Sequence, residues 1–213
     1  STAGTSHGEG FVVCGGGYMG APTDSCELFC PASGTWRLLK TRMLVAVRNA
    51  VAASYHGSLY VIGGIVGMRL GEWSPIVYPI VQRLGPDGKW TLLTNMSSSR
   101  LGHASSLLRG ENGTSSIVVC GGRDRRNDWW QQYSSCEQYL PNEDKWLPFA
   151  SMVKSRAFHG MAEWEGALFT FGGRSWGRRE DIQKTTIERW DPLTNEWRLL
   201  NVTLPGQGLK TWQ

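Results

Sequence analysis

The chain has 213 residues, of which 19% are charged and 40% hydrophobic, and its formal net charge is +4. This composition excludes a disordered chain, and the mild basic excess excludes the footprint of a nucleic-acid-binding protein. Glycine contributes 27 residues and tryptophan 11. Glycine at turns and aromatic residues on strands favour an all-β fold with many tight connections. No apolar run approaches the roughly 18 residues of a membrane helix, so we expect no membrane partner.

Four times along the chain an apolar run ends in a pair of glycines, and a tryptophan follows. The glycine pairs are Gly15-Gly16, Gly63-Gly64, Gly121-Gly122 and Gly172-Gly173, and the tryptophans are Trp36, Trp90, Trp146 and Trp197. Successive pairs lie 48, 58 and 51 residues apart. A period near this length indicates a repeat protein, in which one unit of secondary structure is copied and stacked.

Each copy predicts four short strands, a to d, joined by turns. In the first copy we expect strands at 1–6, 11–14 and 26–30, with Trp36 opening the last. The second copy predicts strands at 49–55, 59–62 and 76–84, with Trp90 opening the last. The third predicts 101–108, 117–120 and 133–140, then Trp146. The fourth predicts 157–164, 167–171, 185–190 and 197–200. The segments between strands b and c are predicted to be polar loops.

The glycine pairs and tryptophans have structural roles in this scheme. Glycine lets the backbone leave strand b in conformations that other residues avoid, with no side chain to clash near a crowded centre. The tryptophan that opens strand d is a large apolar plate, suited to bridging one sheet to the next. A single four-stranded sheet cannot bury both faces, so the copies must pack against one another.

Several strings resemble the kelch repeat. They are SLYVIGG (58–64), ALFTFGG (167–173) and ERWDPLTNEW (188–197), together with Arg48, Arg100 and Arg156, which precede strands a. The resemblance spans nearly the whole chain. It implies an all-β fold, a kelch-type β-propeller with strand a innermost and with four four-stranded blades in this chain. The expected repeats are 1–42, 43–98, 99–153 and 154–204, and 205–213 is a tail or the start of a further strand.

Kelch propellers usually close with six blades, so the resemblance implies that these four form an arc of a larger ring. The alternative is an unusual four-bladed closure. An open arc exposes blade faces that are normally buried, which predicts self-association through its open edges.

The five cysteines have no spacing typical of a metal site, and no cofactor is predicted. Cys14 and Cys120 precede glycine pairs, and Cys26 and Cys136 occupy matching Ser-Cys-Glu strings. These matched positions predict small buried packing residues. An odd count without a disulfide framework favours a reducing compartment, so a cytoplasmic location is expected.

The resemblance also implies that the b–c and d–a loops gather on one face, where this sequence places arginine and tryptophan. The predicted partner-binding residues are Arg48, Asn49, Arg69, Trp73, Arg123, Arg125, Arg126, Trp129, Arg174, Trp176 and Arg178. Arginine binds carboxylates with two hydrogen bonds, and tryptophan offers rigid contact area, so an acidic peptide or protein segment is the expected partner. The alternative is a set of solvated loops, with the repeat-matched arginines tying one blade to the next.

His103 and His159 occupy matching positions three residues after an arginine. They are expected to be inner-strand histidines bonded to the backbone, and a metal or acid–base role is the alternative.

No P-loop, nucleophile elbow or HExxH motif is present in the sequence, so no enzyme is predicted. The leading hypothesis is a protein-interaction module. Its resemblance to BTB–kelch adaptors implies recruitment of substrates to a cullin-RING ubiquitin ligase. A propeller enzyme or metal-dependent specifier, with metal near the two histidines, and a cytoskeletal scaffold are the alternatives.

Overall fold

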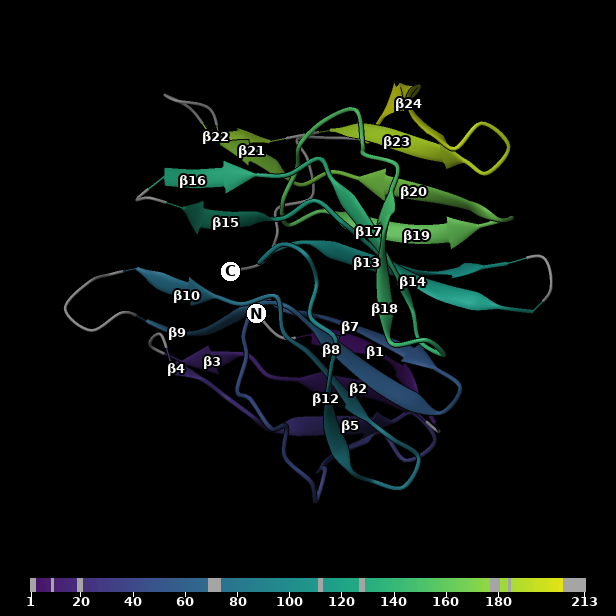
Figure 1. The fold of residues 1–213 in the computed structure, drawn as a ribbon. Coiled ribbons are helices and arrows are strands. Elements are labelled where there is room, and N and C mark those ends of the chain that lie inside the picture. Colours follow the sequence, from purple (N-terminus) through teal and green to yellow (C-terminus); the bar gives the residue numbers. More distant parts are fainter. Residues whose placement is uncertain are drawn as a thin grey trace. The chain divides into compact units, whose positions relative to one another are not determined.

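The computed structural model describes residues 3–8, 10–18, 21–68, 74–110, 113–126, 129–176, 181–183 and 185–204, and every regular element in these ranges is a β-strand. The chain divides into two compact units, Ser1–Leu101 and Gly102–Gln213. Figure 1 shows sheets of antiparallel strands in each unit.

The first unit contains two four-stranded antiparallel sheets, in the orders β1-β2-β5-β6 and β12-β11-β8-β7. Each sheet corresponds to one sequence repeat, and consecutive hairpins connect its strands. The first sheet comprises β1 (Ala3–His7), β2 (Gly10–Cys14), β5 (Cys26–Cys30) and β6 (Thr35–Leu38). The second comprises β7 (Val51–Tyr55), β8 (Ser58–Ile62), β11 (Val81–Leu84) and β12 (Trp90–Leu93).

The second unit repeats this architecture, with sheets in the orders β13-β14-β17-β18 and β19-β20-β23-β24. The third sheet comprises β13 (Ala104–Arg109), β14 (Ser115–Cys120), β17 (Cys136–Leu140) and β18 (Lys145–Phe149). The fourth comprises β19 (Gly160–Trp164), β20 (Ala167–Phe171), β23 (Thr186–Asp191) and β24 (Glu196–Thr203). The four sheets therefore match the four predicted copies of strands a to d.

The segments between strands b and c are two-stranded hairpins rather than the polar loops predicted from the sequence. We call them the b–c hairpins. They are β3–β4 (Gly17–Tyr18 and Ala21–Pro22), β9–β10 (Ile65–Met68 and Pro75–Val77), β15–β16 (Arg123–Arg126 and Trp129–Gln132) and β21–β22 (Arg174–Trp176 and Asp181–Gln183). The sequence did not indicate these strands, because a hairpin that projects from a sheet has no buried face and therefore needs no alternation of apolar and polar residues.

Several strand boundaries differ from the sequence prediction, and three of the differences have a clear physical reason. The segment expected as one strand over 76–84 is split, because its first part pairs with β9 and only Val81–Leu84 joins the second sheet. Pro79 lies at the break, and it has no backbone N–H for a ladder. The a strands of the second unit begin at 104 and 160, three residues later than expected. Gly102 (φ 61°) and Phe158 (φ 54°) precede them in the left-handed region, which a strand does not accommodate.

Within each unit, one sheet packs face to face on the next. In the first unit, Val12, Cys14 and Leu28 of the first sheet pack against a layer of the second sheet formed by Leu59, Val61, Leu84 and Trp90. The second unit has the same arrangement, in which Val118, Cys120 and Cys136 contact Leu168, Trp190 and Trp197. Full burial of one such aliphatic side chain contributes about 1.5–3 kcal/mol, so each layer adds several contributions of this size to the stability of its unit.

Three of the four repeat tryptophans are at least half-buried, and one is not. Trp90 and Trp197 are 8% and 5% exposed. The indole Nε1 of Trp197 donates to the Ala150 carbonyl, 2.8 Å away, so this side chain bridges the fourth sheet to the third. Trp36 is 54% exposed and departs from the expected bridging role. It lies on the face of the first sheet that points away from the second.

All eight repeat glycines have positive φ, between 67° and 101°. Gly15 shows why no larger residue fits, since a Cβ there would lie 2.3 Å from the Val47 carbonyl oxygen. The N–H of the next residue, Gly16, donates a hydrogen bond to the same Val47 carbonyl oxygen, 2.8 Å away. The glycine pair thus lets the chain leave strand b beside the segment that enters the next repeat.

The cysteines differ from the prediction of separate packing residues. Cys14 is bonded to Cys26, and Cys120 to Cys136, while Cys30 is free. Each bonded pair joins directly opposite residues of strands b and c. The sequence placed all four at matched repeat positions, but it did not reveal that strand register puts the members of each pair face to face.

We expect thiol titration of the unfolded, non-reduced chain to find one free thiol, and five after reduction. The two disulfides join residues 12 and 16 positions apart in the sequence. A cross-link that closes a loop of roughly this length stabilises a protein by about 3 kcal/mol. Reduction is therefore expected to lower the urea midpoint of unfolding markedly. Five titratable thiols before reduction would contradict the pairing, and a Cys30→Ser variant, which should leave the midpoint unchanged, is the control.

Candidate functional site

The candidate site in the second unit consists of the two b–c hairpins and the connection between the third and fourth sheets. Gln132 of β16 donates its Nε2 to the Arg174 carbonyl at the start of β21, 2.5 Å away. Ala157, in the connection, exchanges two backbone hydrogen bonds with Arg174, at 3.0 and 2.8 Å. These bonds join both hairpins and the connection into one continuous surface.

A stacked cation organises this surface. The Arg123 guanidinium lies 4.0 Å from the centroid of the Trp130 ring and 5.4 Å from that of Phe158. Phe158 is fixed in a left-handed conformation, and its N–H donates to the Gly102 carbonyl over 2.6 Å. Such a cation–π contact contributes about 0.5–2 kcal/mol. Arg123 is therefore held by aromatic rings and has a positioning role in the hairpin.

Two exposed indoles lie on the same hairpin. Trp129 is 80% exposed and Trp130 is 41% exposed. Adjacent residues of a strand point to opposite faces, so Trp129 lies on the face opposite the Arg123–Trp130 stack. Arg125 is half-buried and is directly opposite Trp130 in the hairpin register. An exposed tryptophan beside arginine is the composition typical of binding hot spots.

In the first unit, Arg48 and Asn49 occupy the connection between the first two sheets. Arg48 forms two backbone hydrogen bonds with Ile65 of β9, and its Nη2 lies 3.4 Å from the Met68 sulfur. Both residues are half-buried, and Asn49 has a φ of 56°. Arg48 thus belongs to the connection that holds the β9–β10 hairpin against the sheets.

Five predicted binding residues are not placed by the structure in full. Arg69, Trp73 and Arg178 lie outside the described residues. For Arg126 in β15 and Trp176 in β21 only the backbone is described. The structure places Arg123, Arg125 and Trp129 in one hairpin, with Trp129 on the face opposite the two arginines, and Arg174 at the start of the neighbouring hairpin. The binding role of the whole predicted set stays a prediction.

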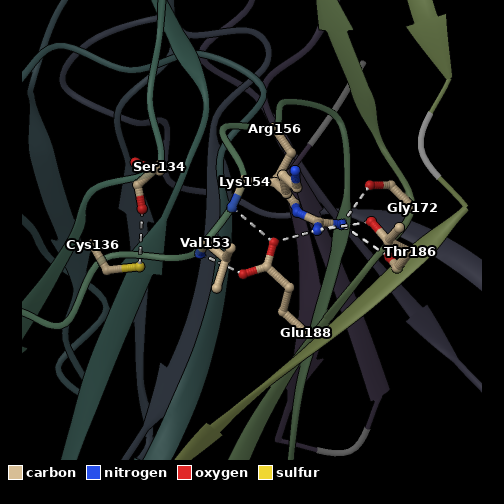
Figure 2. Close-up of polar contacts among 8 residues, drawn as sticks. All are labelled: Ser134, Cys136, Val153, Lys154, Arg156, Gly172, Thr186 and Glu188. Carbon is tan, nitrogen blue, oxygen red and sulfur yellow. Dashed lines mark hydrogen bonds and ion pairs between the residues drawn. The ribbon is translucent and has the colours of Figure 1, made fainter. Parts of the chain in front are cut away.

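The leading arginine of the fourth repeat has a structural position. Arg156 has no exposed surface, and it forms an ion pair of 2.5 Å with Glu188, which is also fully buried. Figure 2 shows its guanidinium also donating to the carbonyls of Gly172 and Thr186, at 3.0 and 3.1 Å. Arg156 lies in the connection that leaves the third sheet, and its side chain binds residues of the fourth sheet. This position favours a structural role, in which the arginine joins one blade to the next, over partner binding.

Glu188 completes this contact from strand c. Its carboxylate accepts hydrogen bonds from the backbone N–H groups of Val153 at 2.6 Å and Lys154 at 3.1 Å. Gln82 occupies the same register position in the second sheet. Its side chain accepts from the Val45 N–H at 3.1 Å and donates to the Val45 carbonyl at 2.8 Å.

We call this contact the strand-c clasp: a buried polar side chain of strand c that binds the segment leaving the preceding sheet. It was not predicted from the sequence, in which the available signal was a glutamate or glutamine at the same position of every strand c.

The two matched histidines lie just before strands a rather than within them. His103 is 4% exposed. Neither ring nitrogen of His159 has a hydrogen-bond partner among the described residues, so the expected backbone bond is not formed there. Desolvation, with smaller contributions from the charges of Arg156 and His103, lowers the pKa of His159 to about 3. His159 is therefore neutral in the folded protein near neutral pH.

This pKa predicts a loss of stability in acid. Folding lowers the pKa of His159, so between about pH 3 and the ordinary histidine pKa of 6.5 the unfolded chain binds more protons than the folded protein. The contribution of His159 is complete above about pH 6.5 and is lost as the pH falls toward 3, at no more than about 1.4 kcal/mol per pH unit. A His159→Phe variant should show a flatter dependence of urea stability on pH than the unchanged protein. Equal slopes for the two proteins would contradict the assignment.

Within the described ranges, no group of three or more histidine, cysteine or acidic residues is arranged to hold a metal ion. The same part of the chain contains no helix long and apolar enough to cross a membrane.

Comparison with known proteins agrees with the repeat architecture. Residues 155–201 match the Kelch motif family. Human Kelch-like protein 23 is 28% identical over 193 residues, which cover 90% of this chain and 31% of that protein. Human Kelch-like protein 34 is 24% identical over 200 residues, covering 93% of this chain and 29% of the relative. Mouse Kelch-like protein 13 is 38% identical over 63 residues, or 30% of this chain and 9% of the relative.

Each sheet has four antiparallel strands, and a glycine pair directly follows its strand b. Repeated sheets of this kind are typical of the β-propeller class. The four sheets of this chain have the architecture of kelch blades, and the chain is similar to Kelch-like proteins along most of its length. It spans about a third of the length of the relatives Kelch-like proteins 23 and 34.

Proposed function

We propose that the chain is a protein-interaction module that binds an acidic or polar segment of a partner on its b–c hairpin surface. The observation that carries the proposal is the 80% exposed Trp129 on a hairpin whose neighbouring strand contains three arginines, Arg123, Arg125 and Arg126. Tryptophan and arginine are enriched among the residues that dominate binding interfaces, and arginine provides paired donors for carboxylates.

The rigidity of the hairpin supports the same proposal. The Arg123–Trp130 stack and the Gln132–Arg174 hydrogen bond hold the hairpin in place before any partner arrives. A surface that is already ordered loses less conformational entropy on binding. The similarity to Kelch-like proteins supports a protein as the partner, and recruitment of substrates to a cullin-RING ubiquitin ligase is the finer form of the proposal.

The proposal is tested by selecting binders from a displayed peptide library and measuring their affinity for variants. Trp129→Ser is expected to weaken binding by about 2 kcal/mol, the usual cost at a hot spot, and Arg125→Glu to weaken acidic peptides further. Leu193 is 94% exposed in the turn between β23 and β24, at the other end of strand c from the hairpins, so Leu193→Ser is the matched control. Selected peptides that bind both hairpin variants as tightly as the unchanged protein would exclude the hairpin surface.

A further inference from the structure

In three of the connections that the structure describes, the second residue before strand a has a left-handed backbone. These residues are Asn49, Gly102 and Phe158, with φ values of 56°, 61° and 54°. Glycine adopts this conformation without strain, and asparagine adopts it more readily than most residues. A bulky aromatic residue rarely does. Phe158 is therefore strained at a position where the other repeats have a residue that suits the backbone.

The surroundings of Phe158 hold it in this conformation. Its N–H donates to the Gly102 carbonyl over 2.6 Å. A Cβ on Gly102 would lie 2.8 Å from the Phe158 ring, so the missing side chain of Gly102 leaves the space that the ring occupies. Strained backbone conformations persist where the surrounding structure enforces them, and they are concentrated at functional sites. What the ring contacts therefore indicates why the strain is kept.

The Phe158 ring contacts a cation of the neighbouring b–c hairpin. Its centroid lies 5.4 Å from the Arg123 guanidinium, and the Trp130 ring lies 4.0 Å from the same group. Arg125 is directly opposite Trp130 in the hairpin register, and Arg123 lies two residues earlier on the same strand. Side chains two residues apart on a strand share a face. The connection thus supplies an aromatic ring to the hairpin face that contains both arginines.

Aromatic contacts of this kind prepare an arginine for a carboxylate. A ring packs on the flat face of the guanidinium, whereas the five N–H donors of arginine lie in the guanidinium plane. The ring contacts therefore fix the orientation of that plane and use none of its donors. A group that is already oriented loses less conformational entropy when a partner binds. A carboxylate is the partner that accepts two parallel N–H bonds from a guanidinium edge.

We propose that Phe158 is a positioning residue of the b–c hairpin surface, and that the Arg123 guanidinium it orients binds one carboxylate of the partner. Phe158 was not among the binding residues predicted from the sequence. The inference rests on the proposed function and names the chemical group that this surface recognises. An asparagine or glycine at position 158 would relieve the strain, but it would leave Arg123 with the Trp130 ring alone.

Substitutions of Phe158 separate positioning from stability. Phe158→Asn removes the ring and introduces the residue of matched position 49, whereas Phe158→Ala removes the ring and keeps a residue that avoids positive φ. The melting temperature of the asparagine variant should therefore exceed that of the alanine variant. Both should bind an acidic peptide, selected with the unchanged protein, about tenfold more weakly, which is the affinity equivalent of one cation–π contact. Phe158→Tyr keeps a ring and should bind like the unchanged protein.

A purely structural role for Phe158 predicts a different pattern. The loss of binding would then follow the loss of melting temperature, and it would be larger for Phe158→Ala than for Phe158→Asn. That pattern, or binding by Phe158→Tyr as weak as that of the alanine variant, would overturn the inference.

Variants of the selected peptide test the carboxylate. Each of its aspartates and glutamates is replaced in turn by asparagine or glutamine. One replacement should weaken binding to the unchanged protein by about tenfold and have little further effect on Arg123→Gln or Phe158→Asn, because groups that interact show non-additive effects. If every replacement has the same effect on all three proteins, Arg123 binds no carboxylate and the inference is overturned.

Trp129→Ser, measured with the same peptide, distinguishes this inference from the proposed function. If Trp129→Ser weakens binding and Phe158→Asn does not, the inference is overturned while the hairpin surface remains the binding site. If neither variant weakens binding, the proposed function and the inference are both overturned.

Discussion

Replacing Arg156 by methionine is expected to lower the free energy of unfolding by about 3–5 kcal/mol, the usual cost of removing one partner of a buried ion pair. Glu188 would keep the N–H groups of Val153 and Lys154, but its charge would lose its partner in a fully buried position. The main-chain carbonyls of Gly172 and Thr186 would each lose a donor as well. Urea unfolding followed by tryptophan fluorescence measures the loss.

The second repeat supplies a natural control for this prediction. Gln82, a neutral residue, makes the strand-c clasp there and is as buried as Glu188. Adding Glu188→Gln to Arg156→Met should therefore recover part of the lost stability, since it removes the unpaired charge and keeps an acceptor. A double variant less stable than Arg156→Met alone would show that the charge of Glu188 is not the source of the cost.

Replacing Trp197 by alanine is expected to cost about 3–5 kcal/mol, as for other large buried aromatic residues. The substitution opens a cavity between the third and fourth sheets and leaves the Ala150 carbonyl without its indole donor. Trp36→Ala removes the same side chain from the matched position of the first sheet, where it is 54% exposed. Its cost should stay below about 1 kcal/mol, near the range for surface substitutions.

The comparison of these two variants isolates burial from residue type. Both replace a tryptophan that opens strand d and lies opposite an aromatic residue of strand c, Phe29 or Trp190. Thermal and urea unfolding of both variants gives the difference directly. Equal costs would mean that the first sheet is covered in solution by something other than what the structure contains.

The repeat and most strands could be predicted from the sequence, because their apolar pattern follows from the packing of the sheets against one another. Strand b must be apolar on both faces when sheets pack on either side, and β8 is buried along its whole length. The expected ranges 26–30 and 167–171 coincide with β5 and β20. The b–c hairpins were not predicted, since a projecting hairpin has no buried face and its sequence carries no alternation.

The contacts between repeats were harder to predict. Nothing in the sequence around Glu188 indicated a contact with another repeat. The strand register of the fourth sheet places its side chain against the segment that leaves the third sheet. The disulfides were missed for the same reason, because Cys14 and Cys26 become neighbours only when strands b and c pair. For the candidate site, the arginines and Trp129 were singled out from the sequence and stay a prediction, whereas the stacking of Arg123 on Trp130 depends on a hairpin that was not predicted.

Site-specific cross-linking tests the central claim that partners bind the b–c hairpin surface. A photoreactive phenylalanine analogue replaces Trp129 in one protein and Leu193 in another, so that both probes are exposed but lie at opposite ends of strand c. With a peptide selected for binding, the account predicts a cross-link from position 129 that excess free peptide abolishes, and none from position 193. Cross-linking from position 193 and not from 129 would contradict the account.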